Sequence, residues 1–378
     1  MPRCGTALAT VREILILAGE ASGDMHGAAL AEQLRGALPG HDLIGIGGSR
    51  MESAGVRIIE HTTGIIGFVE ILRHLPAQLL LLGRIRAQLR RPETALAIMI
   101  DYGGFNLRAA AAAKAAGVPV LYYITPQVWA SRAGRLKTMA RVITKAAVIL
   151  PFEEKLLRAH SVDATFVGHP LIDRAQSLPS RAEARKRLGL GERDAVLALF
   201  PGSRAQEIAR HREDFGAVAA ELERRRPGLK VIVSVAPGLH VAHASLPYQF
   251  VHSAPFDVLR AADVALCKSG TTTLEAAIAG CPCAVVYRVN ALTYAVLKRI
   301  VRVPHIGLVN IVAGRMVAPE FVQDAFVPHD VADALDQLFD ADAPARRAMV
   351  SAFTEVTAAL GQPGASTRVA KMAGAMVR

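Results

Sequence analysis

Short apolar runs of strand length recur along the chain and alternate with segments that have the length and pattern of helices. The runs in the first half are "EILILAG", "LIGIGG", "ALAIMID", "PVLYYI" and "KAAVIL", and those in the second half are "AVLALFPG", "LKVIVSVAPG", "ADVALCKSG" and "CAVVYRV". Strands that alternate with helices in this way predict βαβ units and parallel sheets. The predicted fold class is therefore α/β.

A polar, arginine-rich segment without a predicted strand, Asp173–Asp194, separates the two series of runs. The chain has 378 residues, a length that favours about two domains. We predict two doubly wound, Rossmann-like halves that face a cleft: residues 1–175 and residues 190–345. Residues 346–378 are helical in pattern, and by analogy with other two-domain sheets we expect them to cross back to the first domain.

The first strand leads into "LAGEASGDMHG", Leu17–Gly27, which gathers small and acidic residues where the strand should stop. Small residues let a ligand approach the backbone closely, and Ser22 or Asp24 is suited to cap a helix beginning near Met25. Ligands in doubly wound sheets bind at the carboxyl ends of strands. This stretch therefore predicts a site at the end of the first strand.

In "CKSGTTTLEAAIAGCP", a strand leads into Ser269 and Gly270, and three threonines then open a helix. The unpaired amides and positive dipole end of a first helical turn suit a diphosphate, and Glu275 is placed to accept hydrogen bonds from ribose hydroxyls. The alternative is an ordinary helix whose N-cap is Thr271 or Ser269.

A second turn of this type, "LFPGSRAQEIARH", carries Arg204, whose guanidinium can bridge two phosphate oxygens. Two strand-to-helix turns in one domain, one with an arginine and one with glycine and threonines, predict the two sides of a nucleotide-diphosphate pocket.

The run "IMIDYGGFNLR" ends a predicted strand at Asp101, and two glycines follow Tyr102. A carboxylate at the carboxyl end of a strand is well placed to act as a general base. An equally supported alternative is that Asp101 caps the helix that starts near Asn106.

Composition restricts the partners and the compartment. A formal charge of +11 favours anionic partners, but one tryptophan and the absence of a recognisable reader motif argue against nucleic acid. Cys281 and Cys283 are too closely spaced for a zinc or redox motif, and His240 and His243 lack a third ligand, so no metal site is predicted. The four cysteines are expected to be reduced thiols, mostly buried, in a cytosolic protein. No run reaches the ~20 apolar residues of a membrane span.

Nine motifs in sequence order resemble the lipid-A-disaccharide synthase family, glycosyltransferase family 19. They run from about Ile14 to Asp324 and read "GEASGD", "GGSRMESAG", "GFVEIL", "TPQVWA", "VGHPLID", "FPGSRAQEI", "KSGTTTLEA", "VYRVNALTYAV" and "VNIVAGRMVAPEFVQD". The resemblance implies a GT-B fold and transfer of 2,3-diacylglucosamine from UDP to the 6-hydroxyl of 2,3-diacylglucosamine 1-phosphate (lipid X). The implied products are lipid A disaccharide 1-phosphate and UDP, formed with inversion and without a metal or other cofactor.

The resemblance also implies roles for individual residues. Asp101 matches the essential aspartate of the family and Arg204 its diphosphate arginine, with Glu20 in the first turn as a further catalytic candidate. Ser22, Gly23 and His26 fall on the acceptor side. The UDP site is expected to consist of Arg204, Ser269, Gly270, Thr271, Thr272, Glu275, Asn310, Glu320 and Gln323.

The chain departs from the family pattern at one motif. The family commonly reads Asp-x-Pro-Asp-Phe-Asn where this chain has Asp101-Tyr102-Gly103-Gly104-Phe105-Asn106, so the proline and the second acid are missing. If that acid were indispensable, catalysis here would be impaired; if it only orients the turn, two glycines can serve. We favour the second interpretation, because Asp101 and the nucleotide motifs are retained.

Two stretches mix large aliphatic residues with arginine and lysine: Gly64–Arg91 and Thr293–Gly307. Such stretches suit an anionic leaflet and acyl chains, although ordinary amphipathic helices share this pattern. We therefore expect a cytoplasmic protein bound peripherally to the inner face of the inner membrane. The sequence does not decide whether the protein forms a homodimer. The alternative functions are another GT-B enzyme of UDP-sugars, such as a UDP-N-acetylglucosamine 2-epimerase, or a binding relative that has lost catalysis.

Overall fold

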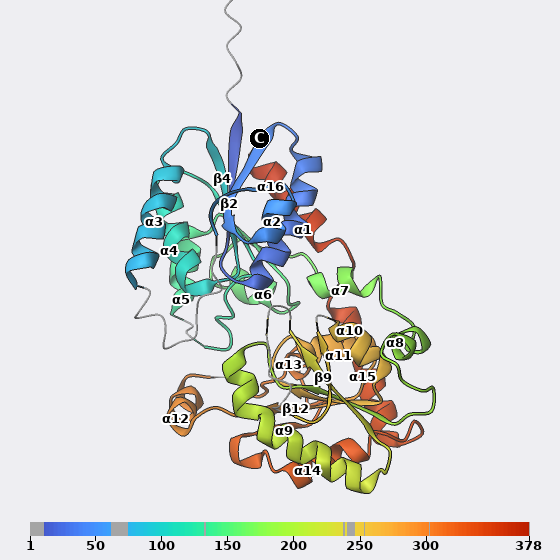
Figure 1. The fold of residues 1–378 in the computed structure, drawn as a ribbon. Helices are drawn as coiled ribbons and strands as arrows, with labels where there is room; N and C mark the ends of the chain where they lie inside the picture. Colours follow the sequence, from blue (N-terminus) through green and yellow to red (C-terminus); the bar gives the residue numbers. More distant parts are fainter. Residues whose placement is uncertain are drawn as a thin grey trace, which may run out of the picture. The chain divides into compact units, whose positions relative to one another are not determined.

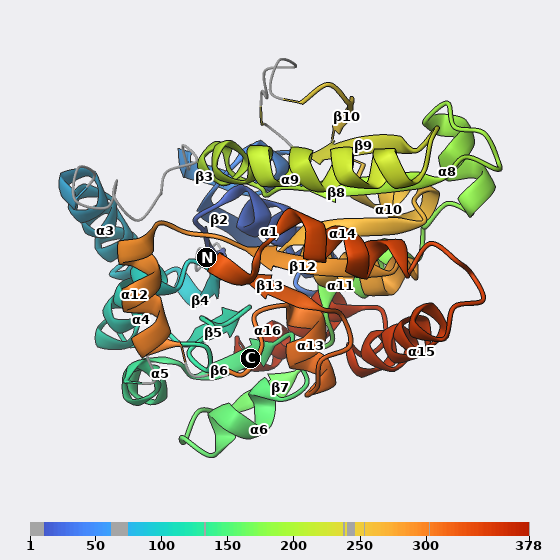
Figure 2. The same ribbon diagram turned by 90° about the horizontal axis from the view of Figure 1, so that it is seen from below.

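The computed structural model describes residues 11–61, 75–131, 134–236, 239, 246–252, 254–301 and 303–377. The chain forms two compact units, one made of Met1–Pro170 with Gln362–Arg378 and the other of Leu171–Gly361. Each unit has one parallel sheet with helices on both faces (Figures 1 and 2). This is the predicted α/β class.

The first unit contains a seven-stranded sheet in the order β3-β2-β1-β4-β5-β6-β7. Its strands are β1 (Arg12–Ala18), β2 (His41–Gly47), β3 (Arg57–His61), β4 (Thr94–Ile100), β5 (Val120–Tyr123), β6 (Lys145–Val148) and β7 (Ala164–Phe166). Its helices are α1 (Ala21–Ala37), α2 (Ser49–Ser53), α3 (Leu75–Leu89), α4 (Gly103–Ala115), α5 (Arg135–Val142), α6 (Glu153–Arg158) and α16 (Ala365–Met376).

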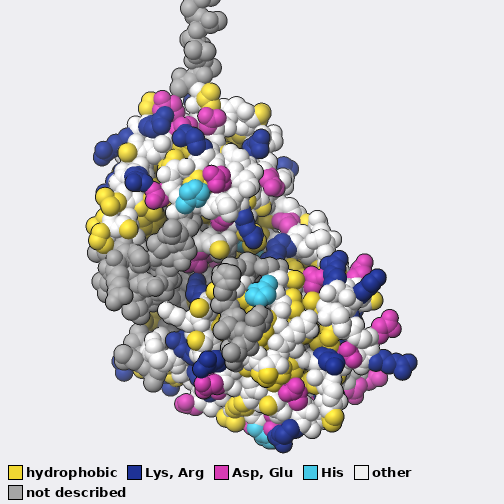
Figure 3. Space-filling view, in the orientation of Figure 1, with side chains coloured by type: hydrophobic (Ala, Val, Ile, Leu, Met, Phe, Trp, Pro, Cys, Tyr) yellow, Lys and Arg dark blue, Asp and Glu magenta, His cyan; other side chains and the backbone are white. Residues whose placement is uncertain are grey.

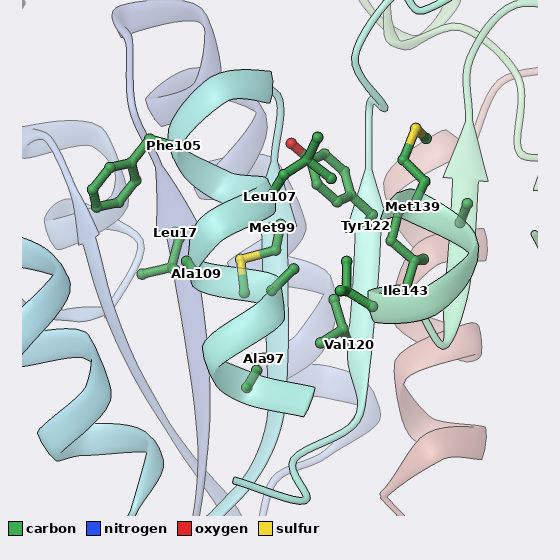
Figure 4. Packing of buried hydrophobic residues seen from close by; sticks show 14 of the residues in the cluster. Leu17, Ala97, Met99, Phe105, Leu107, Ala109, Val120, Tyr122, Met139 and Ile143 are labelled. Carbon is green, nitrogen blue, oxygen red and sulfur yellow. The ribbon is translucent and has the colours of Figure 1, made fainter. Parts of the chain in front are cut away.

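Side chains that alternate along β1 pack into the two faces of this sheet. Ile14 and Ile16 lie in the cluster beneath α1 and α16, whereas Leu15 and Leu17 lie in the cluster beneath α3, α4 and α5. Burial of one such side chain contributes about 1.5–3 kcal/mol, which explains why the central strands are apolar throughout. Figure 4 shows helix α4 packed over side chains of β1, β4 and β5.

The second unit contains a six-stranded sheet in the order β10-β9-β8-β11-β12-β13. Its strands are β8 (Val196–Phe200), β9 (Lys230–Val235), β10 (Gln249–His252), β11 (Val264–Lys268), β12 (Cys283–Tyr287) and β13 (Glu320–Val322). Its helices are α8 (Arg181–Arg187), α9 (Ala205–Arg225), α10 (Pro255–Ala261), α11 (Thr272–Ala279), α12 (Ala291–Ile300), α13 (Leu308–Ala313), a 3₁₀ turn (Gln323–Ala325), α14 (Pro328–Asp336) and α15 (Pro344–Ala359).

The segment expected to connect the domains contains α8 and the last half of α7 (Pro170–Ala175), and the two units meet in sequence between Pro170 and Leu171. The C-terminal residues divide between the units. Helix α15 packs on α11 and α13 of the second unit, whereas α16 packs on α1 of the first. The chain thus returns to the first unit at Gln362, later than the whole-segment crossing from residue 346 that the sequence suggests.

Candidate active site

Helix α1 begins at Ala21, four residues earlier than the sequence suggests, with Glu20 at its N-cap. The cap makes no side-chain hydrogen bond, so neither Ser22 nor Asp24 caps this helix. Ser22 is exposed and Gly23 is buried inside the first turn. Glu20 itself therefore stands at the carboxyl end of β1, between strand and helix.

Asp24 caps a different helix. Its carboxylate accepts hydrogen bonds from the backbone amides of Gly48, Arg50 and Met51 at 2.7, 3.1 and 3.1 Å, which are the first amides of α2. The acid in the first motif thus ties the turn after β1 to the turn after β2. Its role is structural, because these amides account for its burial at 7% exposure.

Asp101 lies at the carboxyl end of β4, where the strand makes an unusual turn. Asp101 and Tyr102 have φ angles of 49° and 52°, in the left-handed region that costs non-glycine residues about 1 kcal/mol or more each. Helix α4 begins at Gly103 with Tyr102 at the N-cap. The N-cap position considered for Asp101 is therefore occupied by its neighbour.

The two glycines that replace the proline and acid of the family pattern have different surroundings. A Cβ on Gly103 would lie 2.6 Å from Cβ of Pro126, so a side chain there requires the Pro126 loop to move. A Cβ on Gly104 would meet only a guanidinium nitrogen of Arg135, at 3.9 Å. A carboxylate at position 104 would therefore face Arg135.

His26 lies beside two other residues at the carboxyl edge of the first sheet. Its ring makes an edge contact with Tyr123, with centroids 6.3 Å apart. Burial, with a further effect of His26, lowers the pKa of His169 to about 3, so His169 is neutral at physiological pH. His169 belongs to the motif "VGHPLID", but the residue pattern alone gave it no role.

In the second unit, Arg204 and Lys268 share the carboxylate of Glu207. Arg204 is the N-cap of α9, in the turn that follows β8, and its Nη1 lies 3.6 Å from Oε1 of Glu207. Lys268, the last residue of β11, donates to the same oxygen at 2.9 Å, and the Ser203 amide donates to Oε2 at 2.9 Å. Burial alone would raise the pKa of Glu207, but Lys268, the Ser203 amide and Arg204 together lower it.

Sequence reasoning missed Glu207 and Lys268. A signal was present, because each is a charged residue that flanks one of the two predicted phosphate turns. Their contact joins the first turn of α9, the helix after β8, to the end of β11, and β8 and β11 are neighbouring strands in the sheet. The pairing therefore brings the arginine turn and the glycine-threonine turn to one edge of the second sheet.

The glycine-threonine turn opens helix α11. Gly270 has a φ of 154°, Thr271 is the N-cap, and α11 begins at Thr272. The cap has no side-chain hydrogen bond, and the Ser269 hydroxyl instead donates to the carbonyl of Ile306 at 2.7 Å. Neither residue acts as the side-chain cap of the alternative interpretation.

Glu275 is buried in α11 and pairs with Arg174, whose Nη1 lies 3.3 Å from Oε1 of Glu275. Burial raises the pKa of Glu275, and Arg174 opposes that rise. The Arg174 guanidinium also lies over the ring of Phe256, 5.2 Å from its centroid. The carboxylate is thus held in place by a side chain from the start of the second unit.

The three downstream polar positions shape loops near the ends of β12 and β13. Asn310 donates to Glu320 at 2.7 Å and accepts from the Val317 and Ala318 amides. The Glu320 carboxylate accepts hydrogen bonds from the Ile306 amide, at 2.9 Å to Oε2, and from the Gly307 amide, at 2.9 Å to Oε1. Gln323 exchanges two hydrogen bonds with the backbone of Val289, at 2.6 and 3.0 Å. Glu320 and Asn310 thus fix the backbone around Ile306, which Ser269 contacts, whereas Gln323 fixes the loop after β12.

The described cysteines, Cys267, Cys281 and Cys283, are free thiols buried in the second unit, and burial raises the pKa of Cys281. Cys4, His240 and His243 lie outside the described residues. Among the described residues, no three His, Cys, Asp or Glu side chains gather as metal ligands would. Within the same residues, no helix is both long and apolar enough to cross a bilayer.

Comparison with known sequences decides the family. The sequence profile described as "Lipid-A-disaccharide synthetase" matches residues 14–369. The chain belongs to this family. It is 38% identical to the lipid-A-disaccharide synthase of Syntrophotalea carbinolica over 377 residues, covering 97% of this chain and 96% of that protein. It is 40% identical to the lipid-A-disaccharide synthase of Anaeromyxobacter dehalogenans strain 2CP-1, over 95% of this chain and 96% of that protein. Membership of the lipid-A-disaccharide synthetase family makes the chain a glycosyltransferase of lipid A biosynthesis.

Comparison with solved structures gives the fold of this family member as GT-B. The glycotransferase of kitacinnamycin matches with a TM-score of 0.64 at 15% identity, over 96% of this chain and 98% of the other. The calicheamicin glycosyltransferase CalG4 matches with a TM-score of 0.61 at 16% identity, over 97% of this chain and 98% of the other. A putative UDP-N-acetylglucosamine 2-epimerase from Listeria monocytogenes matches with a TM-score of 0.63 at 12% identity, over 95% of this chain and 94% of the other. Because an epimerase is among these neighbours, the fold alone does not select the reaction.

Proposed function

We propose that the protein transfers 2,3-diacylglucosamine from UDP to the 6-hydroxyl of lipid X, with inversion, giving lipid A disaccharide 1-phosphate and UDP. The observation that carries the proposal is the placement of Asp101 and Arg204. In a chain of the lipid-A-disaccharide synthetase family, each stands at the carboxyl end of a central strand of a doubly wound sheet. Such strand ends are where these sheets bind ligands.

The second unit supplies the groups that stabilise the leaving diphosphate. Departure of UDP places negative charge on the diphosphate, and Arg204 and the first amides of α11 offer fixed positive charge and donors at one edge of the sheet. Ser269, Gly270, Thr271 and Thr272 form the turn that surrounds these amides. Asn310 and Glu320 support that turn through the Ile306 segment, Gln323 holds the neighbouring loop after β12, and we extend the UDP site to all three.

The first unit supplies the acceptor side. Asp101 removes the proton of the 6-hydroxyl as the anomeric carbon develops oxocarbenium character. Glu20, at the carboxyl end of the neighbouring strand β1, is a second catalytic group, and Ser22, Gly23 and His26, in the first two turns of α1, belong to the acceptor side.

The substitution Glu275→Ala should raise the KM for the UDP-sugar and leave kcat nearly unchanged. A carboxylate that binds ribose stabilises the ground state and the transition state alike, so its loss weakens binding and spares the chemical step. Steady-state kinetics with varied donor measure both constants.

Arg174→Met is the matched control, because it breaks the same ion pair and keeps the carboxylate. We expect its KM to rise much less. Equal increases in the two variants would show that the ion pair, and not a ribose contact, matters.

We further propose that the protein binds the anionic inner face of the inner membrane. Leu79 and Leu80 on α3 are 57% and 72% exposed, and Figure 3 shows hydrophobic side chains gathered on the surface of this helix. Lys298 and Arg299 on α12 are exposed and basic. Of the first stretch that the sequence suggests for this role, residues 64–74 lie outside the described residues. Exposed leucines suit the acyl region of a bilayer, and exposed basic side chains suit an anionic headgroup layer, so each unit by itself offers one of these features.

Replacing Leu79 and Leu80 by serine should weaken binding to phosphatidylglycerol vesicles at least about tenfold, because each leucine loses the free energy of burial in the acyl region. Vesicle co-sedimentation measures this, with phosphatidylcholine vesicles as the uncharged comparison. Met316→Ser removes another exposed apolar side chain, outside both stretches, and should have no effect. Equal binding by the double variant and the wild type would rule out α3 as the membrane contact.

Incubation with UDP-2,3-diacylglucosamine, with and without lipid X, tests the function. Disaccharide that forms only with lipid X is the expected result. A changed sugar without acceptor would indicate the epimerase alternative, and binding without turnover would indicate a relative that has lost catalysis.

A further inference from the structure

The turn that carries Asp101 is held by side chains that have no assigned part in the reaction. Asn106 is 1% exposed, and its Nδ2 lies 2.9 Å from the carbonyl oxygen of Asp101 and 3.1 Å from that of Ile100. The same nitrogen lies 3.3 Å from the carbonyl oxygen of Leu17 on β1. One buried amide group thus connects the carboxyl ends of two neighbouring strands, with its two hydrogens shared among three acceptors.

A second donor reaches the same carbonyl. The hydroxyl of Tyr122, on β5, donates to the carbonyl oxygen of Asp101 at 2.8 Å. The Tyr122 ring is fully buried under α4 (Figure 4), and burial raises the pKa of its hydroxyl, with a smaller effect of the Asp101 carboxylate. The Asp101 carbonyl therefore accepts from β5 and from α4 at once.

The adjoining residue is locked against β1. The Tyr102 ring packs on Gly19 so closely that a Cβ on Gly19 would overlap it. Burial, and then the neighbouring Glu20 carboxylate, raise the pKa of Tyr102. Asp101 and Tyr102 are the two residues with left-handed φ angles at this turn, so the contacts hold the part of the backbone that would otherwise relax.

We propose that Asn106 and Tyr122 are positioning residues for Asp101. They hold the backbone of its turn in the left-handed conformation, and this conformation sets the direction in which the Asp101 carboxylate points. The proposal rests on the proposed function, in which that carboxylate takes the acceptor proton. A base displaced by about 1 Å loses ~10²-fold in rate, so the support of the turn should appear in kcat.

Asn106→Ala tests this proposal, with Gln88→Ala as the matched control. Gln88 is a buried amide that connects the opposite ends of the same two strands, through Nε2 contacts to Glu13 at 2.6 Å and Thr94 at 3.2 Å. The two variants remove similar bonds from β1 and β4, but only one does so at the Asp101 end. Both should lower the melting temperature.

For Asn106→Ala we expect a fall in kcat of about 100-fold with UDP affinity within about twofold of wild type, since the UDP groups belong to the other unit. Gln88→Ala should keep kcat within about twofold. The double variant Asp101→Asn/Asn106→Ala should be no slower than Asp101→Asn, because the base that Asn106 positions is already lost. Equal kcat values for Asn106→Ala and Gln88→Ala, or a full further loss in the double variant, would overturn the proposal.

Tyr122→Phe covers the case in which Asn106→Ala does not fold. It removes one hydroxyl from a buried ring and should lower kcat about fivefold to tenfold, the rate equivalent of one hydrogen bond. An unchanged kcat would overturn the part assigned to Tyr122. If the wild-type chain forms no disaccharide, the proposed function fails as well; if it does and the variants keep their kcat, this proposal fails alone.

Discussion

Asp101→Asn should nearly abolish disaccharide formation while donor binding stays intact. The amide has the shape of the carboxylate but cannot accept the proton of the acceptor hydroxyl. Asparagine also tolerates the left-handed conformation that residue 101 adopts, with a φ of 49°. The hydrogen bonds from Asn106 and Tyr122 go to the backbone carbonyl, so the substitution leaves them in place.

Turnover, UDP affinity and melting temperature should therefore be measured on the same Asp101→Asn sample. We expect an inactive protein with nearly the wild-type melting temperature. Full activity in this variant would remove Asp101 as the base, whatever the change in stability. Loss of activity accompanied by loss of the folded state would instead assign the residue to the structure of the turn.

Arg204→Ala should weaken UDP binding and lower turnover by ~10²-fold or more, the usual effect of removing one donor that stabilises developing charge. The Arg204 side chain is 54% exposed, so its removal leaves no cavity in the core. Its distance of 3.6 Å from Glu207 makes the pair a weak contributor to stability. The loss of activity should therefore come without a large loss of stability.

Arg212→Ala is the control for Arg204→Ala, because Arg212 is a 48% exposed arginine on the same helix that pairs with Glu213. Calorimetric titration with UDP compares the two variants. We expect Arg212→Ala to bind as the wild type does. If Arg204→Ala also keeps wild-type affinity, the diphosphate site lies elsewhere.

The sequence predicted the central strands of both sheets but not the strands at their edges. Every run that the apolar pattern identified is a strand, whereas β3, β7, β10 and β13 were not identified. These four strands are the outermost in their sheets and have three to five residues each. An edge strand is buried less completely and needs no continuous apolar run, so its pattern is weak.

The turns of the candidate site could be predicted from the sequence, but the side-chain contacts that hold these turns could not. Asp101, Arg204 and Gly270 stand at strand ends, as the order of motifs indicates. The amides that Asp24 binds, and the Lys268 ammonium that Glu207 binds, come from other strand-helix units, so these pairs depend on sheet order, which a single sequence does not give. The left-handed turn at Asp101 was also unforeseen, because Asp-Tyr carries no glycine at the two positions concerned.

We propose that this chain transfers a sugar with inversion and stabilises the leaving diphosphate with its own side chains. The most direct measurement is proton NMR of the product formed from lipid X and a donor whose sugar is α-linked to UDP, with a chelator present throughout. We expect a disaccharide whose new linkage is β, formed at the same rate with and without the chelator. An α linkage, or activity that disappears in the chelator and returns with Mg²⁺, would contradict it.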